Sequence, residues 1–185
     1  VWTGGLLGLL AAVSACGSND CAALSRCDIR AVSCQEDVMS WVSCQRGSSA
    51  DLPPVIVVSE SEYVEREEER RRTANPDRTA EDDAKEVGWN RGLAQFKLAP
   101  ESYDRDMEQA LQLETLGAVY EPKTRSVVVI DRGRPLNDAR AVELLVHELV
   151  HALQDASVGF EKFYEKWAYT FDASLAVSGL IEGEA

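Results

Sequence analysis

The chain has 185 residues, of which 45% are hydrophobic and 28% are charged, and its formal net charge is −13 at pH 7. This length allows one globular domain with an appendage. The acidic balance argues against nucleic acid as a partner, because phosphate backbones are bound by basic clusters and the one basic run, at residues 70–72, directly follows three glutamates.

The first sixteen residues have the features of an export signal. An apolar run over residues 6–13 is too short to span a bilayer, and small residues and Cys16 follow it. The tetrapeptide Val-Ser-Ala-Cys at residues 13–16 resembles a bacterial lipobox, whose cysteine is lipidated and becomes the new N-terminus. We therefore expect residues 1–16 to be a lipoprotein signal peptide, and the protein to be exported and anchored to a membrane by lipid. An ordinary cleaved signal peptide and a buried apolar N-terminus are the alternatives.

Four further cysteines lie close together in the sequence, at Cys21, Cys27, Cys34 and Cys44. In an oxidising compartment an even number of cysteines indicates disulfides, here two, with three pairings open. A zinc site is less favoured because the spacings contain no C-x-x-C pair and no histidine lies nearby. We expect residues 17–52 to form a Cys-containing tether or small disulfide module before a domain over residues 53–185.

That domain is predicted to begin with a short buried strand at residues 55–58. A charged helix follows, capped by Ser59 or Ser61. Its glutamates and arginines have the i,i+4 spacing of ion pairs, at Glu62–Arg66, Glu67–Arg71 and Glu68–Arg72. This pattern predicts a solvated helix face.

Two more helices and a hairpin are predicted before the motif described next. Residues 77–98 form the first helix, with Trp89 and Phe96 expected in the core, and residues 100–117 form the second. Two strands, at residues 118–120 and 126–131, flank a turn at residues 121–124 and predict a β-hairpin. Strands and helices before the motif and helices after it indicate an α+β fold with a small mixed or antiparallel sheet.

The segment His147-Glu148-Leu149-Val150-His151 contains H-E-x-x-H and holds the only two histidines of the chain. On a helix these histidines lie one turn apart on one face, so both imidazoles can bind one metal ion. Glu148 lies about 100° further round, where it can reach a metal-held water without being a ligand. Asn137 or Asp138 is expected to cap this helix and Gly159 to end it. A buried helix with two hydrogen-bonded histidines is the alternative.

A catalytic zinc (Zn²⁺) site needs a third protein ligand, and no histidine or nearby cysteine follows His151. The ligand must then be a carboxylate. Residues 172–185 are predicted to form a helix capped by Asp172, on which Glu182 shares a face with two small serines. Because Glu184 points about 200° away from Glu182 on a regular helix, we expect Glu182 to be the ligand.

These motifs resemble those of the gluzincin metallopeptidases. Residues 147–155, with Gly159 beyond them, are similar to the active-site helix of thermolysin-like proteases, and Glu182-Gly183-Glu184-Ala185 looks like the E-G-x-A segment that supplies the third zinc ligand in aminopeptidase-type gluzincins. Closer still are uncharacterised bacterial exported proteins with H-E-L-x-H-A-L-Q-D, whose upstream segment resembles residues 117–124. The resemblance implies that an aspartate at the position of Asp155 hydrogen-bonds a ligand histidine.

The expected fold is therefore zincin-like, with the sheet followed by an active-site helix and a later helix that carries the third ligand. The expected function is hydrolysis of peptide or protein substrates by water activated on zinc, with Glu148 as general base. Gluzincins carry a further C-terminal region, so we expect the domain to continue beyond Ala185. The alternative is a non-catalytic surface lipoprotein that uses a zincin-like domain for binding.

Overall fold

The computed structural model describes residues 21–74, 79–97, 100, 115–168 and 170–185. The elements follow in the order α1 (Val32–Arg46), β1 (Val55–Ser59), α2 (Glu60–Ala74), α3 (Ala80–Gln95), β2 (Ala118–Glu121), β3 (Ser126–Asp131), α5 (Ala139–Val158), α6 (Phe160–Trp167) and α7 (Phe171–Glu184). This arrangement confirms the predicted α+β class and the predicted hairpin. The expected signal peptide with Cys16, and most of the helix expected at residues 100–117, lie outside the described residues. In the described ranges, no helix combines the length and apolar character needed to cross a membrane.

The three strands form one mixed sheet in the order β1-β3-β2. β3 is parallel to β1, with Val129 opposite Val57, and antiparallel to β2, with Val128 opposite Val119. The central position of β3 agrees with its composition, because the strand is buried along nearly its whole length and is rich in β-branched residues. The expectation left open a mixed or an antiparallel sheet, and the sheet is mixed.

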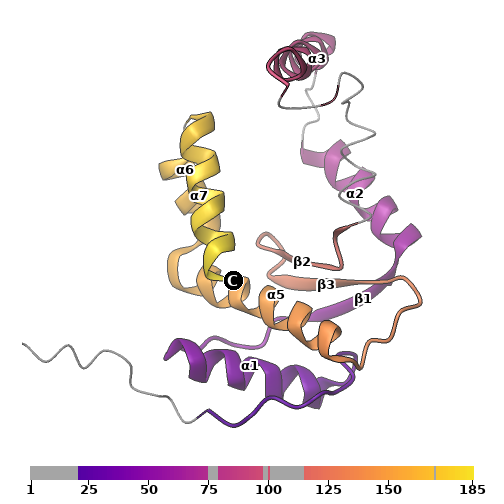
Figure 1. Cartoon of the computed structure of the whole chain (residues 1–185), viewed down its shortest axis with the longest axis vertical. Coiled ribbons are helices and arrows are strands. Elements are labelled where there is room, and N and C mark those ends of the chain that lie inside the picture. The colour runs from indigo at the N-terminus through magenta and orange to yellow at the C-terminus, as the bar shows by residue number, and fades with distance from the viewer. Residues whose placement is uncertain (1–20, 75–78, 98–99, 101–114, 169) are drawn as a thin grey trace, which may run out of the picture.

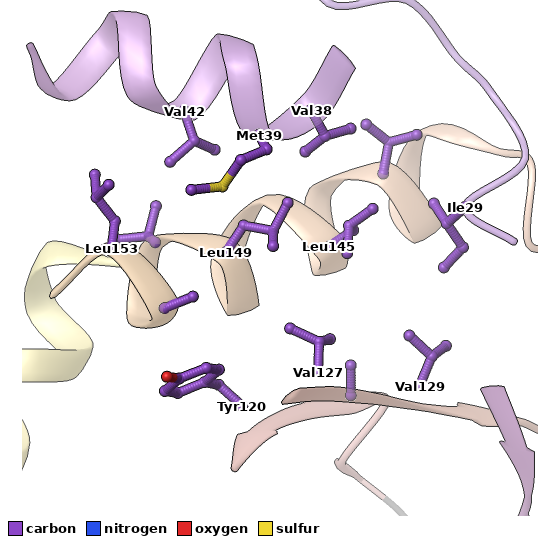
Figure 2. Close-up of a cluster of buried hydrophobic side chains, with 14 of the residues drawn as sticks. Ile29, Val38, Met39, Val42, Tyr120, Val127, Val129, Leu145, Leu149 and Leu153 are labelled. Carbon is purple, nitrogen blue, oxygen red and sulfur yellow. The ribbon is translucent and has the colours of Figure 1, made fainter. Parts of the chain in front are cut away.

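Helix α5 is the centre of the fold and lies between α1 and the sheet (Figure 1). Its Leu145 and Leu149 are fully buried. Figure 2 shows side chains of α1 against one side of α5 and side chains of the sheet against the other. The residues that meet in this cluster include Val38, Met39, Val42, Tyr120, Val127, Val129 and Leu153. A helix covered on two sides needs the wide apolar surface that the sequence of α5 has.

The cysteine-rich segment belongs to this same core. Its disulfides are nested, with Cys21 bonded to Cys44 and Cys27 bonded to Cys34. Cys34 and Ile29 are buried in the cluster that contains the leucines of α5. The boundary expected at residues 52 and 53 therefore does not separate a tether from a domain, because α5 has more apolar surface than the sheet alone covers.

Helix α2 begins as predicted, but two of its expected ion pairs are replaced by others. Ser59 caps it: its Oγ accepts from the N–H of Glu62 at 3.3 Å, and Glu62 Oε2 accepts from the N–H of Ser59 at 2.7 Å. The expected Glu62–Arg66 pair is wrong because this cap engages Glu62, and Arg66 instead lies 3.5 Å from Glu121 of β2.

Two further ion pairs of α2 have i,i+3 spacing, Glu67 with Arg70 and Glu69 with Arg72. The expected Glu68–Arg72 pair is therefore also wrong, since Arg72 turns to Glu69. The side chain of Arg71 lies outside the described residues.

The prediction that Trp89 and Phe96 of α3 lie in the core is wrong. Their exposed fractions are 52% and 79%. Figure 1 shows α3 at the far end of α2, away from the sheet and from α5. Their hydrophobicity alone did not indicate whether the core was within reach.

Candidate metal centre

The two histidines are positioned by α5. Asp138 caps this helix, accepting from the N–H of Ala141 at 2.8 Å, and Gly159 ends it with a left-handed backbone, φ +67°. His147 and His151 then face each other one turn apart. Their Nε2 atoms are 3.1 Å apart, and their rings are nearly perpendicular, at 85°.

Glu182 reaches the histidines from α7. The hydroxyl of Thr170 accepts a hydrogen bond from the N–H of Ala173 at 3.1 Å. Thr170 is therefore the N-cap of this helix, and the expected cap at Asp172 is wrong. Glu182 Oε2 lies 3.3 Å from His147 Nε2 and 3.5 Å from His151 Nε2. The structure thus brings together the three residues that the sequence singled out as ligands.

Glu184 points elsewhere, as the helical period requires. Its carboxylate lies 3.3 Å from Gln154 Nε2 and 3.8 Å from Arg46 Nη1. Arg46 also donates to the backbone carbonyl of Glu184, so the end of α7 is held against the end of α1.

The spacing of the three ligand atoms fits a tetrahedral zinc ion. Zinc bonds of about 2.0–2.1 Å at the tetrahedral angle place two ligand atoms roughly 3.3 Å apart. The three observed separations, 3.1, 3.3 and 3.5 Å, bracket that value. Two imidazoles and one carboxylate are also a donor set that zinc accepts in catalytic sites. Within the described part of the chain, this is the group of histidine, cysteine and acidic side chains that could hold a metal ion.

The site is buried on one side and open on the other. The His151 side chain is 8% exposed, whereas those of His147 and Glu182 are 37% and 63% exposed. A solvent-facing side leaves room for the water or substrate that a catalytic zinc site keeps as its fourth ligand.

Glu148 lies beside this group and is buried. Its Oε2 accepts a hydrogen bond of 2.7 Å from the backbone N–H of Tyr120. Burial raises the pKa of Glu148, although the nearby histidines and this hydrogen bond act in the opposite direction. A carboxylate with a raised pKa binds a proton more readily, which is what a general base must do.

Asp155 does not have the expected role. Its Oδ2 accepts from the Tyr120 hydroxyl at 2.8 Å, and its Oδ1 accepts from the N–H of Phe160 at 2.6 Å. Both carboxylate oxygens are thus engaged by β2 and by the first turn of α6. The expected bond to a ligand histidine is made by another residue: Gln154 Oε1 lies 2.9 Å from His151 Nδ1.

Sequence reasoning missed Gln154 and Tyr120. Gln154 had a usable signal, because a side chain three residues after a ligand histidine lies on the same side of the helix. Tyr120 had none, since it meets Glu148 and Asp155 across 28 and 35 residues. Burial is the main cause that raises the pKa of the Tyr120 phenol, and the hydrogen bond to Asp155 raises it further. The phenol therefore stays neutral and can donate.

Comparison of the chain with family models, curated proteins and solved structures found no match.

Proposed function

We propose that this protein is a zinc-dependent peptidase with a zincin-like fold of the gluzincin type. The observation that carries the proposal is the triangle of His147, His151 and Glu182 with ligand-atom separations of 3.1–3.5 Å, beside the buried Glu148. The order of mixed sheet, motif helix and later ligand-bearing helix supports the same assignment.

The chemistry follows from the positions of the side chains. His147, His151 and Glu182 would hold the ion, and a bound zinc supplies a water of lowered pKa and a positive charge that stabilises the developing oxyanion. Glu148 accepts a proton from the attacking water and returns it to the leaving amine. Among the hydrogen bonds of the described residues, Glu148 accepts only through Oε2. Oε1 is therefore the oxygen that would take the proton from the attacking water. The hydrogen bond from the Tyr120 N–H holds Oε2 against strand β2.

We further propose that the protein acts outside the cytoplasm as a bacterial lipoprotein, anchored to a membrane through Cys16. The lipobox-like sequence supports this, and so do the two disulfides, which persist in oxidising compartments. Its substrates would be peptides or proteins at that surface. Cys16→Ser should release the protein from the membrane fraction into the soluble fraction, and mature protein that retained residues 1–15 would contradict the anchor.

The test of activity is hydrolysis of a broad peptide library by the zinc-loaded protein, with and without chelator. We expect cleavage that is lost on chelation and restored by zinc. A folded, zinc-loaded protein that cleaved no member of the library would overturn the peptidase assignment in favour of a binding protein.

A further inference from the structure

Gln154 connects the two helices that carry the ligands. Its Oε1 lies 2.9 Å from Nδ1 of His151 on α5. Its Nε2 donates to the backbone carbonyl of Ile181 on α7 at 3.1 Å and to the carboxylate of Glu184 at 3.3 Å. One side-chain amide therefore contacts a ligand histidine and the residue immediately before the third ligand.

The contacts on α7 decide which way the amide faces. A backbone carbonyl and a carboxylate only accept hydrogen bonds, so the end of Gln154 next to them must be its NH₂ group. The carbonyl oxygen of the amide then faces His151. Because that oxygen only accepts, Nδ1 of His151 must carry the proton.

The proton on Nδ1 of His151 determines whether the other ring nitrogen, Nε2, can bind a metal ion. A neutral imidazole protonated at Nδ1 has a lone pair at Nε2, which is the form that binds a metal ion. Nε2 of His151 is the atom that lies 3.1 Å from His147 Nε2 and 3.5 Å from Glu182 Oε2. A lone pair so close to a carboxylate oxygen is unfavourable unless a cation or a proton lies between them.

The same amide sets the position of α7 along α5. Its Nε2 donates to the carbonyl of Ile181, which is the residue immediately before Glu182. Gln154 is half-buried, and it lines an open pocket of about 340 Å³ together with Val150, Leu153, Phe163 and Leu180.

We propose that Gln154 is a positioning residue for the metal centre, which holds His151 in its metal-binding tautomer and places Glu182 within reach of the histidines. This inference rests on the proposed metal site but not on peptidase activity.

The experiment uses two variants of Gln154 and one control. Gln154→Met has a similar length and loses both sets of hydrogen bonds. Gln154→Glu keeps an acceptor for His151 but loses the donor to Ile181. Ser157→Ala is the matched control, because it lies one turn further along α5, lines the same cavity and bonds only to the backbone of its own helix.

The first measurement is the ¹⁵N spectrum of the imidazoles in the metal-free protein at about pH 8, above the ordinary histidine pKa of about 6.5. The chain has only two histidines, so their signals are readily separated. We expect the Nδ1–H tautomer of His151 in the wild type, in Ser157→Ala and in Gln154→Glu, and a shift toward the Nε2–H tautomer in Gln154→Met. An unchanged tautomer in Gln154→Met would overturn the tautomer role.

The second measurement is zinc affinity by chelator competition. We expect Gln154→Met to bind zinc roughly 10–100-fold more weakly, as is typical when a partner of a ligand histidine is lost. Gln154→Glu should recover part of this loss, because it restores the histidine contact but not the contact with α7, and Ser157→Ala should match the wild type. Equal affinity in all four proteins would overturn the positioning role. If the wild type bound no zinc, the proposed function would fail, and the tautomer spectra of the metal-free proteins would still decide the role of Gln154.

Discussion

The backbone N–H of Tyr120 on strand β2 donates a hydrogen bond of 2.7 Å to the carboxylate of Glu148 on helix α5. The hydroxyl of the same tyrosine donates to Asp155, about two helical turns further along α5. One residue of the sheet therefore holds the motif helix at two points. The orientation of the proposed general base thus depends on the sheet as well as on the helix that carries it.

Glu148→Gln should separate chemistry from metal binding. The glutamine carbonyl can still accept from the Tyr120 N–H, and the three ligand side chains are unchanged, so fold and zinc content should persist. The variant has no carboxylate to accept a proton, and peptide hydrolysis should fall by roughly 10²–10⁴-fold or more. Metal analysis and kcat/KM on one peptide check this. A variant as active as the wild type would mean that Glu148 is not the base.

Glu182→Gln should weaken zinc binding, with Glu184→Gln as its matched control on the same exposed turn. The first variant replaces an anionic ligand by a neutral one, and the loss should exceed the roughly 10–100-fold typical of losing a residue that only contacts a ligand. The second keeps all three ligands, and its affinity should stay within a few-fold of wild type. Zinc titration against a competing chelator distinguishes the two variants. A larger loss of affinity in Glu184→Gln would mean that Glu184, and not Glu182, is the third ligand.

Removal of zinc should destabilise the protein, because the ligands come from α5 and α7 and the ion would join them. At free zinc about 1,000 times the Kd, binding to the folded state contributes about 4 kcal/mol to the free energy of unfolding. Thermal unfolding with zinc and with chelator measures this difference as a change in Tm. In His147→Ala the two curves should coincide; a persistent difference in that variant would place the stabilising metal elsewhere.

Tyr120→Phe should destabilise the fold without releasing zinc. The substitution leaves Asp155 Oδ2, in a buried carboxylate, without its hydroxyl donor, at a cost of about 1–3 kcal/mol in the free energy of unfolding. Urea unfolding and zinc content check both parts. Asp155→Asn should likewise lose stability and keep zinc. Loss of zinc in that variant would instead support the contact between Asp155 and a ligand histidine that the sequence predicted.

The two disulfides should differ in their effect on stability. They join residues 23 and 7 positions apart, and loop-closure entropy predicts losses of about 3.5 and about 2.5 kcal/mol respectively. Cys21→Ala and Cys27→Ala each break one bond and leave the buried Cys34 in place, so packing changes little. Urea unfolding should show the larger loss in Cys21→Ala. Any thiol of Cys21, Cys27, Cys34 or Cys44 that reacted in denatured, unreduced wild type would contradict this pairing.

Features that depend on a short stretch of chain followed from the sequence. The helical period alone places His147 and His151 on one face and separates Glu184 from Glu182. Local hydrogen bonding similarly explains the cap at Asp138 and the end of α5 at Gly159, and two short apolar runs around a turn predict the hairpin of β2 and β3. These properties are set by neighbours within one or two turns, which the sequence shows directly.

Features that depend on distant contacts were decided by the tertiary structure. Asp155 and Gln154 are adjacent and both suited to bond a histidine, and only the positions of Tyr120 and Phe160 show that Asp155 is already engaged. Likewise, the sequence did not reveal that α1 shares the core of α5, or that Trp89 has no place in it. A hydrogen bond or an apolar contact needs a partner at the right distance, and only the packing of helices and strands supplies that partner.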